Sequence, residues 1–429
     1  MFLTPPFGRL DPSSTHPIAV AVSGGGDSIF ALRRTVAWAK AAGRPVVALH
    51  VDHGLQPQSA AWADFVGETA AALGASFRRR SWDGPKPARG LAAAARRARH
   101  RLLADAARDA GAAVIVTGHT ADDALENQRL GQGRLTDWSP SPIWPEGRGI
   151  FLLRPLLGLR REGIRNHLRA EDTAWIDDPT NDDPRQPRIA ARQAIAGIFP
   201  PLYGEGRDEA QPRRRVGTFQ TTPPGPADHP PHEGEGKEAA DLARAAAIRD
   251  AVITLPRAAL FAAPPAARRK VLAAALVCAG GGERLPRTDA LDRLLVRLAS
   301  GETFAATLCG ARLEAAGTLT IVRDIGEAGR AGLRSGGPVW DGRYDATGVY
   351  GEIRPLKGLA ASLPPAQRSR LRNLPPAARA ALPVVVAHGQ VTCPILAQPS
   401  SPSMASLVGA RFAAACGALA REGDLTPRV

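Results

Sequence analysis

The residues with the clearest chemical potential form a glycine-rich loop, Ser23-Gly24-Gly25-Gly26-Asp27-Ser28, between an apolar run and a segment with a helical pattern. Glycines let an anion approach the backbone closely, and the N–H groups at a helix start favour negative charge. The serines add hydroxyl donors, and Asp27 adds a carboxylate for a cation or a reacting group. The loop lacks the Lys of the Walker pattern and is not GxGxxG. Because it stands between a strand and a helix, we expect a phosphate site rather than a plain turn.

A second polar segment begins where another apolar run ends, Thr117-Gly118-His119-Thr120-Ala121-Asp122-Asp123-Ala124-Leu125-Glu126. On a helix, Asp122 and Asp123 lie four and three residues before Glu126, which places their side chains close together. Carboxylates beside a phosphate loop suit Mg²⁺, for which we expect Asp27 and Asp123 as ligands. The alternative is an acidic first turn that stabilises the helix dipole. The sequence leaves both interpretations open.

Basic side chains are expected near the same place. His53 follows the second strand-like run and His119 follows the fourth, where open α/β sheets bind their ligands. Arg96 and Arg99 share one face of the helix that we predict between these runs. That face can contact a ligand, although a solvated basic face would explain either arginine nearly as well.

The elements that would position these residues alternate as in a parallel α/β domain. The expected strands are Ile18–Val22, Val46–Val51, Phe77–Trp82, Val114–Thr117 and Phe151–Leu153. The expected helices are Ser28–Ala42, Ser59–Leu73, Leu91–Ala110 and Arg160–Arg169. Most of these strands are mainly apolar, as are strands buried on both faces of a sheet. We therefore predict a doubly wound parallel sheet.

The rest of the chain predicts further regions. Pro, Gly and charged residues dominate residues 201–240, which cannot bury a core and are expected to be a linker or insertion. A small, mainly helical domain should follow, with Asp241–Ala279 helical and a strand pair around Gly317. The last hundred residues predict a C-terminal α+β region. The expected boundaries are 1–200, 201–240, 241–325 and 326–429.

The charge of the chain favours a polyanionic partner. Its 429 residues include 55 Lys or Arg and 41 Asp or Glu, which gives a formal net charge of +14. Arginine neutralises phosphates and displaces their counterions, so nucleic acid is the natural candidate. A GC-rich genome would explain the same excess of arginine. Such a genome also favours Ala, Gly and Pro, and all three are abundant in this chain. Charge alone does not decide between the two.

The cysteines and the hydropathy of the chain exclude several classes of protein. Cys278, Cys309, Cys393 and Cys416 form no CxxC pair, which argues against a zinc knuckle or an iron–sulfur cluster. Scattered cysteines suit a reducing cytosol. The N-terminus has no signal-peptide pattern, and no run approaches the roughly 18 apolar residues of a membrane span. We expect a cytoplasmic protein without a membrane segment, and nothing predicts a protein partner.

The pattern SGGxDS resembles the PP-loop of the ATP pyrophosphatases, which bind ATP and release pyrophosphate while transferring AMP to an oxygen. Residues 16–195 as a whole are similar to the tRNA(Ile)-lysidine synthetase family. The likeness rests on the loop, the acidic segment, and two further stretches: Leu153-Arg154-Pro155-Leu156-Leu157 and Trp175-Ile176-Asp177-Asp178-Pro179-Thr180-Asn181-Asp182. Residues 307–323 resemble that family's small tRNA-holding domain more weakly.

This resemblance implies a two-step reaction on a tRNA(Ile) that carries a CAU anticodon. ATP first adenylates the C2 carbonyl oxygen of the wobble cytidine, and the ε-amine of free L-lysine then attacks C2 and expels AMP. By the same resemblance, Ser23–Ser28 bind the ATP phosphates, and Asp27, Asp123 and Glu126 serve Mg²⁺ and the reacting groups. The residues expected near the nucleotide or cytidine are His53, Arg96, Arg99 and His119.

The sequence departs from that family's pattern near the expected acceptor pocket. Glu126 is followed by Asn127 rather than Thr, and Gly131-Gln132-Gly133 arrives about one turn before the family's Arg-Gly-Ser-Gly. His100 stands where Tyr is usual. These differences bear on the acceptor more than on ATP.

Three other functions use or could retain such a loop. A tRNA thiolase needs cysteines near the site, and the N-terminal half of the chain has none. An amide-forming ligase such as a GMP, NAD or asparagine synthetase draws ammonia from a glutaminase, whose cysteine pattern is absent. An RNA-binding protein that has lost catalysis would not need the intact SGGGDS with Asp123 and Glu126.

Overall fold

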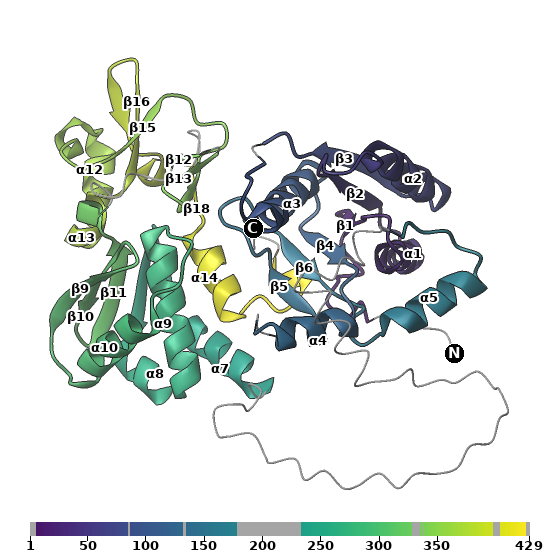
Figure 1. Cartoon of the computed structure of the whole chain (residues 1–429). Coiled ribbons are helices and arrows are strands. Elements are labelled where there is room, and N and C mark those ends of the chain that lie inside the picture. The colour runs from purple at the N-terminus through teal and green to yellow at the C-terminus, as the bar shows by residue number, and fades with distance from the viewer. Residues whose placement is uncertain are drawn as a thin grey trace, which may run out of the picture.

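The computed structural model describes residues 6–84, 86–131, 134–177, 233–327, 335–336, 338–397 and 404–425. Along the chain it shows an N-terminal α/β unit, a middle unit built on an antiparallel sheet, and a C-terminal unit with two small sheets (Figure 1). None of the described helices is long and apolar enough to cross a membrane.

The N-terminal unit is built on a six-stranded sheet with the order β3-β2-β1-β4-β6-β5. Its strands are β1 (Ile18–Ala21), β2 (Val46–Asp52), β3 (Ser76–Ser81), β4 (Val114–Thr117), β5 (Trp138–Pro140) and β6 (Phe151–Leu153). Neighbours run parallel except at the edge, where β5 pairs antiparallel with β6. Every predicted strand is present, and the short β5 is an addition.

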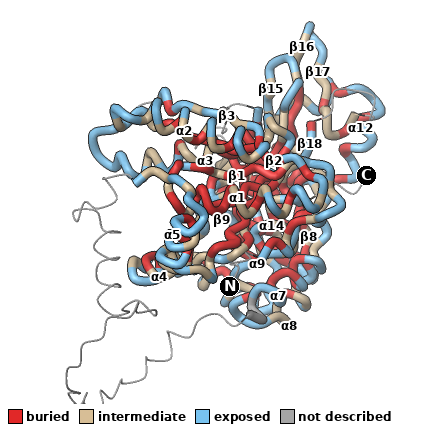
Figure 2. The backbone as a smooth tube through the Cα atoms, turned by 90° about the vertical axis from the view of Figure 1, so that its right-hand side faces the viewer, coloured by how far each residue is buried: buried red, intermediate tan, exposed pale blue. Residues whose placement is uncertain are grey.

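Helices cover both faces of this sheet. They are α1 (Gly26–Ala41), α2 (Ser59–Ala72), α3 (Leu91–Asp109), α4 (Ala121–Arg129) and α5 (Arg161–Ala170). Ile18 and Val20 of β1 pack in one core with α1, α2 and α5, whereas Ala19 packs in a second core with α3. Figure 2 shows buried backbone concentrated in the central strands. The prediction of a doubly wound parallel sheet is therefore confirmed.

The middle unit packs four helices on a five-stranded antiparallel sheet with the order β7-β8-β11-β10-β9. The helices are α7 (Glu233–Arg244), α8 (Arg257–Ala262), α9 (Pro265–Gly280) and α10 (Thr288–Ala299). The strands are β7 (Ala247–Arg249), β8 (Val252–Pro256), β9 (Phe304–Leu308), β10 (Ala311–Ala315) and β11 (Thr318–Arg323). The strand pair predicted around Gly317 is present as β10 and β11.

Two expectations for this unit are corrected. Asp241–Ala279 is not helical throughout, because β7 and β8 form a hairpin whose turn holds Asp250 at a φ of 50° and Ala251 at 66°. β8 also pairs with β11, a distant strand that no local pattern could reveal. The expected linker ends earlier than residue 240, since α7 begins at Glu233 and buries Ala239. Residues 201–232 lie outside the described residues.

The C-terminal unit has the predicted α+β character. One sheet contains β12 (Ser335–Gly336), β13 (Val339–Trp340), β14 (Tyr344–Asp345) and β18 (Ala405–Ser406). The other contains β15 (Glu352–Pro355), β16 (Pro383–Ala387) and β17 (Gln390–Thr392). The helices are α12 (Pro365–Leu371), α13 (Pro376–Arg379) and α14 (Val408–Cys416).

The last described residues return to the N-terminal unit. α14 packs on α9, and the segment after it runs along the N-terminal sheet (Figure 1). There the carboxylate of Glu422 accepts two hydrogen bonds of 2.7 Å from Arg44, whose side chain is fully buried. Arg44 also donates to the backbone oxygens of Asp11 and His16. This buried ion pair links the two ends of the chain.

We expect Glu422→Ala to lower the free energy of unfolding by about 3–5 kcal/mol, because Arg44 would remain buried without its counter-charge. Urea titration of the variant and the wild type measures the loss. Glu302→Ala is the matched control: its ion pair with Arg297 is exposed, so the loss should stay below about 1 kcal/mol. Equal losses in the two variants would contradict a dominant role for the buried pair.

Candidate active site

The glycine-rich loop connects β1 to α1 at the carboxyl end of the central strand. Gly24 has a φ of 95°, which side chains with a Cβ rarely allow, and α1 begins at Gly26. The hydroxyl of Ser28 donates to the carbonyl of Gly25 at 2.8 Å and accepts from the N–H of Ser23 at 3.2 Å. These bonds hold the loop curled around the start of the helix.

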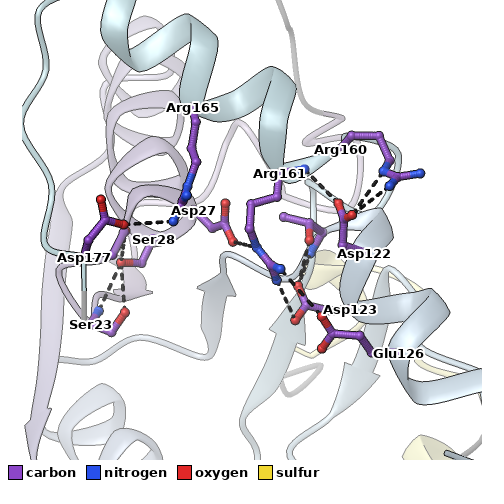
Figure 3. A network of polar contacts seen from close by, with 12 residues as sticks. Ser23, Asp27, Ser28, Asp122, Asp123, Glu126, Arg160, Arg161, Arg165 and Asp177 are labelled. Atoms are coloured by element: carbon purple, nitrogen blue, oxygen red, sulfur yellow. Dashed lines mark hydrogen bonds and ion pairs between the residues drawn. The ribbon is translucent and has the colours of Figure 1, made fainter. Parts of the chain in front are cut away.

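A segment that the sequence did not assign to the site packs on this loop. Ile176 donates its N–H to the carbonyl of Gly24 at 2.9 Å, and a Cβ on Gly24 would lie 2.5 Å from Ile176 Cδ1. Asp177, the next residue, accepts a bond of 2.8 Å from Arg165 of α5 (Figure 3). Residues 175–177 therefore form one wall of the loop. Residues 178–182 of the same motif lie outside the described part of the chain, as do Gln132 and Gly133.

The three predicted acidic residues surround one guanidinium group. β4 pairs directly with β1, so the polar segment after β4 lies beside the loop. Arg161, the first residue of α5, contacts Asp27 Oδ2 at 2.9 Å, Asp123 Oδ1 at 3.4 Å and Glu126 Oε1 at 3.6 Å (Figure 3). The structure thus brings together Asp27, Asp123 and Glu126. Arg161 was not predicted, because its place in the sequence, within a helical pattern, carries no signal for a site.

The acidic helix start has both of the roles that the sequence left open. Asp123 Oδ2 accepts hydrogen bonds from the N–H and the hydroxyl of Thr120, both at 2.8 Å, in a capping box at the start of α4. Its other oxygen faces Arg161. Asp122 accepts the backbone N–H of Arg161 at 2.8 Å and so stabilises the start of α5. Asp122 is therefore a helix-stabilising residue, whereas Asp123 also faces the site.

The two aspartates of the cluster have opposite pKa shifts. Burial raises the pKa of Asp27 more than Arg161 lowers it, and Asp27 Oδ1 is buried without a hydrogen-bond partner among the described residues. Burial also acts on Asp123, but Arg161 and the N–H of Thr120 outweigh it and lower the pKa of Asp123. Burial disfavours the charge of Arg161, yet Asp123 and Asp27 raise its pKa above the usual range. The site therefore holds carboxylates with different proton affinities.

The donor set suits Mg²⁺ bound together with phosphate. Such an ion commonly takes about one or two carboxylates and fills its other positions with water and phosphate oxygens. The unpartnered Oδ1 of Asp27 is a buried oxygen of the required kind, and Asp123 contacts the same guanidinium. A group of three or more His, Cys, Asp or Glu side chains arranged around a metal is not found in the described part of the chain.

Two buried histidines, His119 and His100, have lowered pKa values, and His119 lies near Asp123. Burial, aided by nearby arginines, lowers the pKa of His119 to about 3, although Asp123 acts in the opposite direction. Thr117 Oγ1 lies 2.8 Å from His119 Nδ1. Burial likewise lowers the pKa of His100 to about 3, and its Nε2 has no hydrogen-bond partner among the described residues. The sequence singled out His100 as a departure from the family pattern and not as a site residue.

The predicted basic residues share one electrostatic neighbourhood. The charges of Arg96 and Arg99 contribute to the low pKa of both His100 and His119. Burial lowers the pKa of His53, and Arg99 lowers it further. The four predicted contact residues, His53, Arg96, Arg99 and His119, therefore lie around the same end of the sheet.

The chain is similar to known proteins in both sequence and structure. A family model described as a PP-loop domain matches residues 6–198. A tRNA(Ile)-lysidine synthase of Caulobacter vibrioides is 44% identical over 436 residues, which cover 96% of each chain. A protein of the same name from Hyphomonas neptunium is 42% identical over 188 residues, covering 42% of this chain and 50% of its own.

Among solved structures, the U34-tRNA thiolase NcsA of Methanococcus maripaludis aligns with 46% of this chain and 69% of its own. The sequence identity is 14% and the TM-score 0.38. The Caulobacter vibrioides relative, in contrast, matches nearly the whole chain at high identity. The chain therefore belongs to the tRNA(Ile)-lysidine synthase family.

Proposed function

We propose that this protein ligates L-lysine to C2 of the wobble cytidine of a tRNA(Ile) with a CAU anticodon, forming lysidine. The reaction consumes ATP and releases AMP and pyrophosphate. The observation that carries this proposal is the 44% identity over 96% of both chains with a relative named tRNA(Ile)-lysidine synthase. The position of the glycine-rich loop beside three acidic side chains supports it.

In the first step, Ser23–Ser28 bind the phosphates of ATP. The N–H groups at the start of α1 bind the anion, and the hydroxyl of Ser28 keeps the loop in shape through its bond to the Gly25 carbonyl. The three glycines have no side chain that would block the approach of the phosphates. Asp27 and Asp123 would hold Mg²⁺, which would neutralise charge on the phosphates and on the leaving pyrophosphate. The C2 oxygen of cytidine attacks the α-phosphorus, and the bond from that phosphorus to pyrophosphate breaks.

In the second step, the carboxylates of Asp123 and Glu126 bind the cationic lysine. Its ε-ammonium group passes a proton to one of these carboxylates, and the nitrogen then forms a bond to C2. The C2–O bond breaks, and AMP leaves with the electron pair. The neutral His119 and the charged Arg96 and Arg99 contact the cytidine or the nucleotide, with His53 at the same end of the sheet. Charged groups fixed in a site of low dielectric stabilise charge that develops in the transition state.

The other units serve the tRNA in this proposal. The N-terminal unit is catalytic, the middle unit binds tRNA, and the C-terminal unit adds further tRNA contacts. Residues between the first two units connect them. A net charge of +14 supports a polyanionic substrate, and the reaction takes place in the cytoplasm.

Thiolation of a tRNA base is the alternative, and the positions of the cysteines disfavour it. Cys278, Cys309, Cys393 and Cys416 all lie in the C-terminal half of the sequence. Burial raises the pKa of Cys278 and Cys393 to about 11 and that of Cys416 to about 12, so these thiols are poor nucleophiles.

Incorporation of labelled lysine tests the proposed function. The protein is incubated with ATP, Mg²⁺, lysine and a tRNA(Ile) transcript with a CAU anticodon, and AMP and pyrophosphate are measured in parallel. We expect incorporation that requires both ATP and the wobble cytidine, so a transcript with uridine at that position is the control. Pyrophosphate release without lysine incorporation would indicate that the protein uses a different acceptor. No pyrophosphate release with any transcript would indicate that catalysis has been lost.

A further inference from the structure

Arg161 contacts every acidic residue of the site, although nothing in the sequence marked it. Its Nε, Nη2 and Nη1 atoms each face a different carboxylate, those of Asp27, Asp123 and Glu126 respectively. We propose that Arg161 is a positioning residue that sets the spacing between the phosphate loop and the carboxylates that receive the amine. This inference rests on the proposed function and adds to it a residue that need not touch either substrate.

The three carboxylates come from two separate elements, and ion pairs with Arg161 join them. Asp27 lies in the first turn of α1, whereas Asp123 and Glu126 lie on α4. The Arg161 side chain is 18% exposed and that of Glu126 is 2% exposed, so little water screens their charges. Three carboxylates this close repel one another unless a cation lies between them. The guanidinium therefore holds the N-terminal part of α4 against the phosphate loop (Figure 3).

The backbone of Arg161 is itself fixed to α4. Asp122 accepts the N–H of Arg161 at 2.8 Å, and Ala121 donates its N–H to the carbonyl of Leu159 at 2.9 Å. The starts of α4 and α5 are thus bound to each other. From this fixed point the side chain reaches across to Asp27, so the position of the loop carboxylate depends on Arg161.

The shape of the guanidinium matters as well as its charge. A planar group with three separate nitrogens can contact three carboxylates at once, whereas the ammonium group of lysine is a single point charge. The bond to Asp27 uses Oδ2 and leaves Oδ1, which is buried and has no partner in the described residues. Arg161 thereby orients Asp27 with one oxygen available to a ligand.

Replacing Arg161 tests this assignment. We expect Arg161→Gln to lower kcat for lysine incorporation by about 100-fold, the order of loss that follows a displacement of about 1 Å between reacting groups. Binding of a non-hydrolysable ATP analogue, measured by calorimetry, should change by less than about threefold, because backbone N–H groups hold the phosphates. Arg161→Lys should recover part of kcat but not all of it, since it restores the charge without the planar shape.

Arg160→Gln is the matched control. Arg160 is the N-cap residue just before Arg161 and pairs with Asp122, but its side chain is 46% exposed. This substitution should change kcat by less than about fivefold. Urea titrations of all variants report whether the fold is retained.

Two results would overturn the assignment. One is an Arg161→Gln protein with the kcat of the wild type. The other is an Arg161→Lys protein as inactive as Arg161→Gln, with both unfolding at much lower urea than the wild type, since Arg161 would then serve only the stability of the fold. Failure of the proposed function is distinct from both: the wild-type protein would incorporate no lysine while still binding the ATP analogue.

Discussion

Gly25→Val is expected to lower kcat/KM for ATP-dependent lysine incorporation by about 100-fold or more, a loss comparable to removal of an essential anion contact. Gly25 has a φ of −69° and a ψ of 155°, an extended conformation that valine adopts without strain. A Cβ at this position would meet no atom closer than Ser23 Oγ at 3.7 Å. The fold therefore has room for the side chain, whereas a phosphate that approaches the loop does not.

The same geometry makes Gly25 a better test than its neighbours. At Gly24 the positive φ and the close contact with Ile176 would strain any side chain, so lost activity could reflect lost folding. For Gly25→Val the free energy of unfolding should fall by less than about 1 kcal/mol, because valine is a poorer N-cap than glycine. Calorimetry with an ATP analogue should show lost binding. Gly8→Val, where a Cβ meets nothing within 4 Å, is the control, and a folded Gly25→Val protein with full activity would contradict the phosphate site.

Asp123→Asn is expected to lower lysine incorporation by about 10²–10⁴-fold, the range for loss of a charged group that takes part in proton transfer. Asparagine keeps the size of the side chain, and its carbonyl oxygen can accept the capping bonds from Thr120 that Asp123 Oδ2 accepts. Its amide NH₂ then faces Arg161, so the charge that binds the lysine amine is lost while the start of α4 persists. ATP should still bind, because the loop is intact.

Single-turnover incorporation of labelled lysine, measured beside binding of an ATP analogue, checks this result. Asp109→Asn provides the control, because it makes the same change in an exposed ion pair with Arg80 at the C-terminal end of α3. Full incorporation by a folded Asp123→Asn protein would show that another residue binds the lysine amine. Loss of ATP-analogue binding would instead indicate that Asp123 acts chiefly on the nucleotide.

Much of the fold was predictable because its signals are local. Apolar runs such as Val114–Thr117 are strands buried on both faces, and a glycine follows α1, α2 and α3 within two residues of their ends. These patterns placed five of the six strands of the N-terminal sheet within one residue at each end, and β5 was not predicted. The hairpin of β7 and β8 was missed because it is short and stands between alanine-rich helices, and its pairing with β11 is long-range.

For the site, the sequence by itself determined the chemistry that the loop and the acidic segment can perform. Both begin where a strand ends, and the carboxyl ends of adjacent parallel strands meet at one edge of the sheet. Ser23–Ser28, Asp123 and Glu126 were identified for that reason. The types and spacing of these residues are enough to predict a phosphate-binding site next to carboxylates.

Only the tertiary structure decided which charges neutralise those carboxylates and how the chain closes on itself. Arg161 lies 134 residues from Asp27, and Arg44 lies 378 residues from Glu422. Each pair forms because helices and strands bring distant segments together. Burial then makes the loss of either partner strongly destabilising. A sequence with 55 basic and 41 acidic residues offers many such pairings. The folded chain selects among them by geometry, which no local pattern records.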